Sequence, residues 1–222
     1  GNHNVQVLGD SYRFRGLPYA GKEVENLTKL LPKTTKLIDK KFNKADTTVK
    51  MNEYNILHFA THAAFVPGDA SKSFILFGDG KTANLKEIGN WTLNNVDLVV
   101  LSACQTGIGG KFGNGEEILG LGYQFQSRGV RATIASLWKV SDDGTQLLMN
   151  SFYNVLKQGN ITKAEALRQA QIALITNDYS AVGGKRGGIF VEGDGNEKLK
   201  QTGNKLQHPY YWAPFILIGN GL

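Results

Sequence analysis

The chain has 222 residues, with 25 Lys and Arg against 19 Asp and Glu, which gives a net charge of +6. Hydrophobic residues make up 41% and charged residues 20%, the balance of an ordinary globular protein rather than of a disordered or fibrous one. No apolar stretch approaches the roughly 20 residues of a membrane span, and the first residues, GNHNVQ, have no signal-peptide character, so we expect a cytoplasmic protein with a single domain over residues 1–222.

The first 50 residues carry most of the net charge. They hold ten Lys or Arg and five Asp or Glu, and most of the lysines lie between residues 27 and 44. These lysines alternate with Leu, Ile and Phe at the spacing of a helix or a short strand, and no arginine cluster or nucleic-acid motif accompanies them. We interpret the segment as a solvated face, and direct binding of nucleic acid by this domain is the less favoured alternative.

Three apolar runs predict the centre of a sheet. They are YNILHFATH (54–62), VDLVVLSAC (96–104) and RATIASLWKV (131–140), and all three are rich in residues that favour strands. Near-continuous apolar sequence without polar alternation is typical of parallel strands that are covered on both faces. A fourth run, APFILIGNG near the C-terminus, is expected to add another strand.

Helical segments alternate with these runs, as parallel connections require. The segment after the third run is expected to end at Gly159, and Thr162 with Glu165 has the spacing of a capping box that opens the next helix. This alternation predicts an α/β fold, a three-layer α/β/α sandwich with a mostly parallel central sheet. The four predicted helical segments are residues 23–31, 116–129, 145–159 and 162–175.

Residues 180–206 interrupt the alternation with seven glycines and mixed charges. Such a composition indicates a long mobile loop or a short hairpin. We expect an insertion here rather than a second domain.

Chemically useful side chains follow the ends of the predicted strands. The first run ends at His62, the second at Cys104, and the third leads to Asp142 and Asp143. Ligands bind outside the carboxyl ends of parallel strands, because the loops there converge on a crevice. A base, a soft nucleophile and an acid are therefore predicted along one edge of the sheet, which is what a cysteine peptidase needs.

Cys104 is the only cysteine, so an internal disulfide is impossible and the thiol is available for chemistry. An ordinary thiol, with a pKa of about 8.5, is only slightly ionised at neutral pH, and an adjacent imidazole raises the thiolate fraction. The alternative is that Cys104 is a small core residue and His62 a hydrogen-bonded structural residue. The chain also begins without Met, and we expect it to be part of a longer protein.

His58 and His62 form an H-x-x-x-H pair, which on a helix would suggest zinc. The glutamate of a metalloprotease motif is missing between them, and the segment is predicted to be a strand. We therefore expect no metal, and we interpret His58 as a core histidine.

Several motifs occur in an order that resembles a known family. ILHFATHA is followed by DLVVLSACQTG, then by IASLWKVSDDGT, and finally by HPYYWAPFILIGNG. Together they resemble the CHAT family of caspase-like cysteine peptidases, which is related to caspases and separase and is often attached to tetratricopeptide repeats. The resemblance covers nearly the whole chain.

This resemblance implies a caspase-like fold with a His–Cys dyad and no metal or organic cofactor. On the family pattern His62 is the general base and acid and Cys104 is the nucleophile, while the backbone N–H groups of Ala63 and Cys104 hold the oxyanion. Many relatives have glycine where this chain has Ala63. SLWKVSD also resembles a separase motif in which the aspartate, here Asp142, lines the pocket for an arginine before the scissile bond. The alternative for Asp142 is an N-cap of the following helix, a role that Ser141 and Asp143 also suit.

The function that follows is a cysteine endopeptidase that cleaves a protein substrate after a basic residue, preferably arginine. The resemblance further implies regulation by an upstream repeat region or another attached domain, in bacterial signalling or defence, and no membrane partner. A catalytically silent interaction module with the same fold is the main alternative. A nucleic-acid binder that uses the lysine-rich N-terminal segment is the second.

Overall fold

A computed structural model describes residues 2–66, 69, 71–102, 104–106, 116–138, 140–184 and 205–222. For residues 18, 19, 104–106, 116, 117 and 142 the description is limited to the backbone. The chain divides into two compact units. Unit 1 comprises residues 1–21, 37–139 and 216–220, and unit 2 comprises residues 22–36, 140–215 and 221–222.

The main sheet of unit 1 has the order β10-β9-β7-β3. β3 and β7 are parallel with Ile56 opposite Leu98, and β7 and β9 are parallel with Leu98 opposite Ala132. Every residue of β7 and β9 is buried, as expected for central strands covered on both faces. The predicted α/β class with a mostly parallel sheet is confirmed. The strands are β3 (Ile56–Phe59), β7 (Leu98–Leu101), β9 (Ala132–Ser136) and β10 (Phe215–Gly219).

A second sheet of unit 1 corrects the predicted ends of the first two strands. β3 ends at Phe59 and β7 at Leu101, well before His62 and Cys104, and each run then starts a new strand. Residues 61 and 62 pair instead with β5, since the Thr61 hydroxyl donates to the Leu76 carbonyl at 2.7 Å and the Leu76 N–H donates to the His62 carbonyl at 2.9 Å. This sheet has the order β6-β5-β4-β8, with β4 (Ala63–Phe65), β5 (Phe74–Leu76), β6 (Thr82–Asn84) and β8 (Cys104–Thr106).

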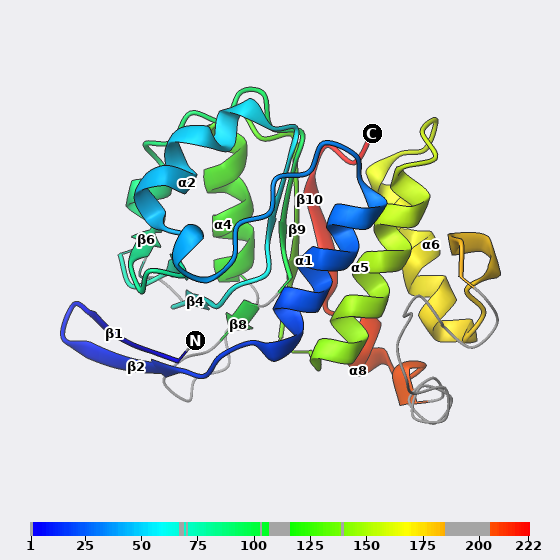
Figure 1. Cartoon of the computed structure of the whole chain (residues 1–222), viewed down its shortest axis with the longest axis horizontal. Coiled ribbons are helices and arrows are strands. Elements are labelled where there is room, and N and C mark those ends of the chain that lie inside the picture. Colours follow the sequence, from blue (N-terminus) through cyan, green and yellow to red (C-terminus); the bar gives the residue numbers. More distant parts are fainter. Residues whose placement is uncertain are drawn as a thin grey trace. The chain divides into compact units, whose positions relative to one another are not determined.

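An N-terminal hairpin that the sequence analysis did not predict joins β1 (His3–Val7) to β2 (Asp10–Phe14), and it forms a separate two-stranded ribbon (Figure 1). Its turn residues, Leu8 and Gly9, have φ values of +48° and +88°, the left-handed conformation of a tight two-residue hairpin turn. Burial alternates along both strands, so one face of the ribbon is apolar. That face packs with β4 and β5 in a cluster of Val5, Val7, Tyr12, Phe14, Ala64, Phe74 and Leu76.

Unit 1 also contains helices, and the longest of those described here, α4, corresponds to the segment predicted between the second and third runs. Its residues Ile118, Leu121 and Phe125 belong to the larger apolar core of the unit. The bounds are η1 (Asp39–Lys41), α2 (Lys44–Lys50), η2 (Met51–Glu53), α3 (Leu85–Ile88) and α4 (Glu116–Ser127).

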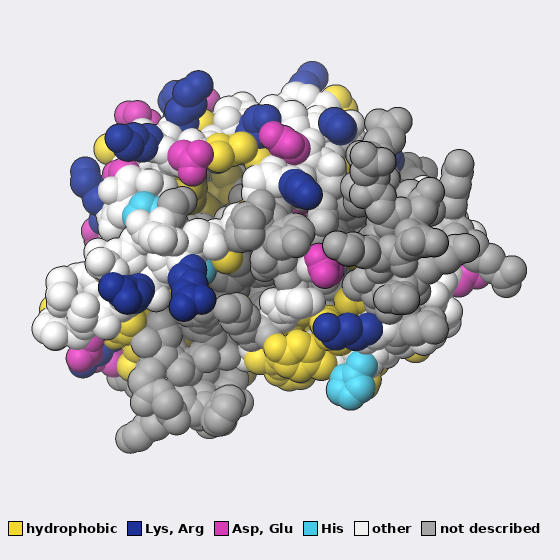
Figure 2. All heavy atoms as spheres, turned by 60° about the horizontal axis from the view of Figure 1, so that its bottom comes forward, with side chains coloured by type: hydrophobic (Ala, Val, Ile, Leu, Met, Phe, Trp, Pro, Cys, Tyr) yellow, Lys and Arg dark blue, Asp and Glu magenta, His cyan; other side chains and the backbone are white. Residues whose placement is uncertain are grey.

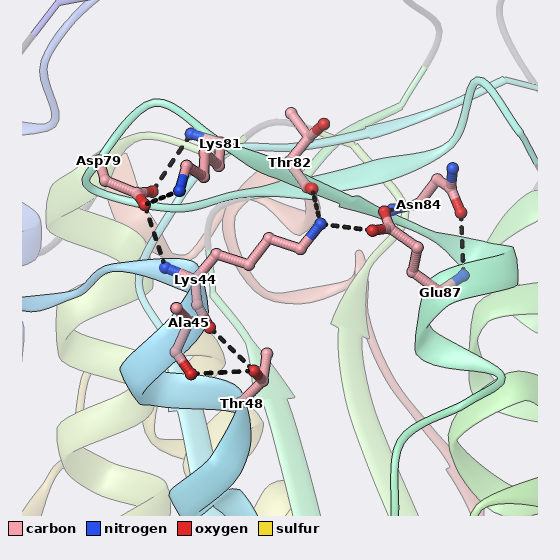
Figure 3. Close-up of polar contacts among 8 residues, drawn as sticks. All are labelled: Lys44, Ala45, Thr48, Asp79, Lys81, Thr82, Asn84 and Glu87. Carbon is pink, nitrogen blue, oxygen red and sulfur yellow. Dashed lines mark hydrogen bonds and ion pairs between the residues drawn. The ribbon is translucent and has the colours of Figure 1, made fainter.

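Lys44, at the start of α2, connects three segments of unit 1 (Figure 3). Its ammonium donates to the Thr82 carbonyl at 2.7 Å and to the carboxylate of Glu87. The same carboxylate accepts from the Asn84 N–H at 2.9 Å, as half of a capping box that opens α3. One lysine thereby holds the start of α2 against β6 and α3, about 40 residues away in the sequence.

Unit 2 is helical, and α5 and α6 lie side by side in it (Figure 1). α5 begins at Asp142, three residues earlier than predicted. The predicted end at Gly159 is wrong, since α5 ends at Leu156 with Lys157 as its C-cap, and Gly159 lies two residues further on with a positive φ of 70°. Thr162 caps α6 by accepting from the Glu165 N–H at 3.1 Å. The bounds are α1 (Pro18–Leu30, of which residues 22–30 belong to this unit), α5 (Asp142–Leu156), α6 (Lys163–Thr176), η3 (Ser180–Val182) and α8 (Pro209–Trp212).

The Glu165 carboxylate does not complete the predicted capping box. It accepts two bonds of 2.6 Å from the Arg168 guanidinium and one of 2.9 Å from the Gln169 amide. These bonds lower the pKa of Glu165 to about 2, and the bond from Arg168 has the largest effect.

Of the predicted insertion at 180–206, residues 180–182 form η3, and most of the remainder lies outside the described residues.

Within the part of the chain that the structure describes, no helix has the length and apolarity needed to cross a membrane.

Gly122 provides a test of how closely α4 packs on β10. A Cβ at this position would lie 2.7 Å from Cγ2 and 2.9 Å from Cδ1 of Ile218, whereas a Cβ at Gly120 on the same helix would meet nothing within 4 Å. We expect Gly122→Ala to lower the free energy of unfolding by about 1–2 kcal/mol through overpacking. Gly120→Ala should raise it by about 0.5–1 kcal/mol, since alanine is the better helix former. Urea unfolding of both variants measures the difference, and equal shifts would contradict this packing.

Glu87 should contribute a pH-dependent part of the stability. Partial burial opposes its ionisation, but the bonds from the Lys44 ammonium and the Asn84 N–H outweigh that effect and lower its pKa below the ordinary 4.5. A depressed pKa stabilises the folded state above the unfolded-state value, and that stabilisation is lost as the pH falls through the folded-state value. Glu87→Gln should therefore be less stable at pH 7 and should lose less stability on acidification below about pH 4.5 than the parent protein. Urea unfolding at a series of pH values measures the free energy of unfolding of both proteins. The same pH dependence in the variant and the parent protein would contradict the prediction.

Candidate active site

His62 lies on the short connection between β3 and β4, directly before Ala63. Its side chain is buried, with 7% of its surface exposed, and its Nε2 lies 2.6 Å from the carbonyl oxygen of Arg15. A carbonyl oxygen can only accept, so Nε2 carries the hydrogen and donates it. In the neutral ring Nδ1 is then the nitrogen that carries no hydrogen.

The imidazole of His62 also packs against an aromatic ring. The Phe14 centroid lies 4.8 Å from the imidazole centroid, with 33° between the ring planes. Phe14 ends β2 and is buried, so both the carbonyl and the ring that contact His62 come from the N-terminal hairpin and the residue after it. The sequence analysis missed these residues. The alternation in VQV and YRF indicates a hairpin, but a contact made by a backbone carbonyl has no signature in residue type.

Cys104 is the first residue of β8, which pairs with β4 in parallel. In this pairing Cys104 lies opposite Ala63, the residue that follows His62. Neighbouring strands are about 4.8 Å apart, so the backbones of these two positions are adjacent. The structure thus brings positions 63 and 104 together on neighbouring parallel strands, with His62 directly before β4, and these strands are β4 and β8 rather than the longer ones predicted.

Three residues separate β3 from β4, whereas two separate β7 from β8. The extra residue on the first path changes the register between the two parallel pairs. Its effect resembles that of a β-bulge, in which one additional residue in a strand changes the direction of the neighbouring side chains. His62 lies on this longer connection.

Asp142 is the first residue of α5, in unit 2. The N-cap position of this helix is occupied by Ser141, so the N-cap alternative for Asp142 is wrong. The side chain of Ser141 makes no capping hydrogen bond. The assignment of Asp142 to an arginine pocket stays a prediction.

The other histidines have separate positions. His58 lies within strand β3, which removes the helical spacing that an H-x-x-x-H zinc site requires, and His208 caps α8 by accepting from the Tyr210 N–H at 3.2 Å. No group of three or more His, Cys, Asp and Glu side chains among the described residues is arranged to hold a metal ion.

Two lysines of the lysine-rich segment, Lys36 and Lys44, lie beside acidic side chains. Lys44 pairs with Glu87, and Lys36 lies 3.8 Å from Glu25. On the face drawn in Figure 2, Lys and Arg side chains are interspersed with Asp and Glu side chains among the described residues.

Comparison with known proteins assigns the chain to a family. The model of the CHAT domain matches residues 1–220, which span both units. A search of curated proteins found no match. The mixed α/β fold is the one expected of caspase-like proteins. The chain belongs to the CHAT domain family, a family of caspase-like peptidases.

Proposed function

We propose that this protein is a cysteine endopeptidase in which His62 and Cys104 form the catalytic dyad. The observation that carries the proposal is the parallel pairing of β4 with β8, with Ala63 opposite Cys104. The orientation of His62 by the Arg15 carbonyl, at 2.6 Å from Nε2, adds support because it leaves Nδ1 as the proton acceptor. Family membership supports the same class of reaction.

In the first half-reaction, Nδ1 of His62 takes the proton from the thiol of Cys104. The thiolate attacks the carbonyl carbon of the scissile peptide, and a C–S bond forms as the carbonyl π electrons move to oxygen. The imidazolium then gives its proton to the amide nitrogen, the C–N bond breaks, and the amine fragment leaves. A thioester to Cys104 remains.

In the second half-reaction, water replaces the amine. His62 accepts a proton from the water as its oxygen attacks the thioester, and the C–S bond breaks to release a carboxylic acid and the thiol. We assign the negative oxygen in both steps to the backbone N–H groups of Ala63 and Cys104, two residues that lie opposite each other in the β4–β8 pairing. Loss of one such donor typically costs about 3–4 kcal/mol of transition-state stabilisation.

The preferred residue before the scissile bond is proposed to be arginine, held by the carboxylate of Asp142. Guanidinium and carboxylate match as a two-bond pair, so arginine is favoured over lysine. The protein substrate would be met in the cytoplasm, under control of an attached repeat region or another regulatory domain.

Replacement of Cys104 tests the nucleophile. Cys104→Ala should abolish cleavage, with a loss of at least about 10³-fold, since no other side chain can form the thioester. Alanine fits the start of a strand, so the far-UV spectrum and Tm should stay those of the parent. The measurement is cleavage of arginyl peptides by the natural full-length protein, with its activator present.

An arginyl chloromethylketone supplies the direct readout for this variant. The chain has one cysteine, so a label that the parent protein takes up and Cys104→Ala does not is localised to this thiol. A folded, activated parent protein that is neither labelled nor able to cleave peptides would instead support a catalytically silent module.

Asp142 has a matched control in its neighbour Asp143. Both residues lie in the first turn of α5, so each substitution is expected to remove a similar favourable interaction with the helix dipole. Asp142→Ala should lower kcat/KM for arginyl substrates about tenfold to 100-fold, the value of a charge-assisted hydrogen bond, whereas Asp143→Ala should leave it nearly unchanged. Alkylation of Cys104 by iodoacetamide should not change in either variant. Equal losses in both variants, or a matching loss in alkylation, would refute the pocket assignment.

A further inference from the structure

The peptide unit between Arg15 and Gly16 is held at both of its polar ends. Its carbonyl accepts from Nε2 of His62 at 2.6 Å, and its N–H donates to the side-chain oxygen of Asn2 at 2.8 Å. Asn2 directly precedes β1, and Gly16 follows β2 by two residues. The two ends of the hairpin are thus linked through the same peptide unit that orients the imidazole.

We propose that the N-terminal hairpin is a positioning element of the active site, and that Asn2 and Phe14 are the residues through which it acts on His62. The inference rests on the proposed function, because it assigns these residues to the orientation of the catalytic base. Neither residue is assigned a contact with substrate.

Asn2 acts through the rigidity of the peptide plane. The carbonyl and the N–H of a trans peptide point in opposite directions and rotate together, because the C–N bond has partial double-bond character. A hydrogen bond to the Gly16 N–H therefore restrains the direction of the Arg15 carbonyl. That carbonyl selects which nitrogen of His62 carries the hydrogen, and hence which nitrogen can take the thiol proton.

Phe14 acts through packing against the imidazole. It is only 2% exposed, and its ring is held by Phe74 of β5, with centroids 6.0 Å apart and the rings nearly perpendicular. The ring therefore presents a fixed surface to His62 at 4.8 Å. The carbonyl restrains the imidazole at one atom and Phe14 restrains the plane of its ring.

Asn2 offers a test that does not disturb the core, since its side chain is exposed. Asn2→Ala removes the acceptor, Asn2→Asp keeps an acceptor oxygen, and Asn4→Ala removes the same side chain from an exposed position of β1. We expect kcat for an arginyl peptide to fall about threefold to tenfold in Asn2→Ala, the loss that corresponds to one neutral hydrogen bond, with KM unchanged. Asn2→Asp should recover most of the loss, and Asn4→Ala should match the parent.

The imidazole itself supplies a readout that a purely structural role would not change. In ¹H–¹⁵N spectra of the full protein, with His62 assigned from the His62→Gln spectrum, the parent and Asn4→Ala should show a hydrogen-bonded Nε2–H. In Asn2→Ala this signal should shift or exchange faster with water. An unchanged His62 signal together with an unchanged kcat in Asn2→Ala would overturn the role of Asn2.

Phe14 has a matched control in Tyr12, which lies two residues earlier on the same buried face and packs against Phe74 at 5.4 Å. Both Phe14→Leu and Tyr12→Leu remove an aromatic ring from the same apolar cluster. We expect kcat to fall about tenfold to 100-fold in Phe14→Leu, as for a small displacement of a catalytic group, and to change less than threefold in Tyr12→Leu. Equal losses of kcat at equal Tm would show that the hairpin acts through stability alone.

These outcomes are separable from failure of the proposed function. If the parent cleaves no peptide and its thiol is not labelled, the peptidase proposal fails, while the Nε2–H signal of His62 still reports whether Asn2 and Phe14 orient the ring. If the parent is an active peptidase and neither variant alters that signal, only the positioning proposal fails.

Discussion

The parallel pairing of β4 with β8 is the constraint on which the candidate site depends. Parallel strands have no direct connection, so residues 63 and 104 become neighbours only through the packing of the segments between them. The β3–β7 pair one step earlier sets the direction of both chains. The unequal connections, three residues before β4 and two before β8, then bring Ala63 rather than His62 opposite Cys104. One residue more or fewer in either connection would move every side chain of the following strand to the opposite face of the sheet.

The apolar runs were sufficient to predict the core of this fold, for a physical reason. Strands buried on both faces tolerate few polar residues, so the sequences of β7 and β9 are almost entirely apolar. The ends of the strands are less visible, because ATH and SAC contain no Gly or Pro that would mark a break after the main sheet. What separates β3 from β4 is a set of bonds from residues 61 and 62 to Leu76, a partner that no local pattern identifies. The structure thus pairs Ala63, the residue after His62, with Cys104, on strands that the sequence analysis did not distinguish.

The surroundings of His62 show a second limit of sequence analysis. Spacing and residue type can indicate a histidine near a cysteine, since both side chains carry chemistry. The group that selects the tautomer is a main-chain carbonyl, and any residue at position 15 would supply one. The start of α5 illustrates the same limit in a milder form. Ser141, Asp142 and Asp143 all suit an N-cap, and only the backbone conformation, with Ser141 extended at φ −64° and ψ 146°, distinguishes them.

The hairpin is the least self-sufficient element of unit 1. A two-stranded ribbon is at best marginally stable alone, so β1 and β2 depend on the apolar cluster that they form with β4 and β5. Its ion pair with the rest of the unit, Asp10 to Lys72 at 2.8 Å, is largely exposed and adds little. Elements with few buried contacts open at lower free energy than the core around β7 and β9. Because the hairpin and the peptide after it also contact His62, the geometry of the proposed base depends on an element that opens at lower free energy than the main sheet around β7 and β9.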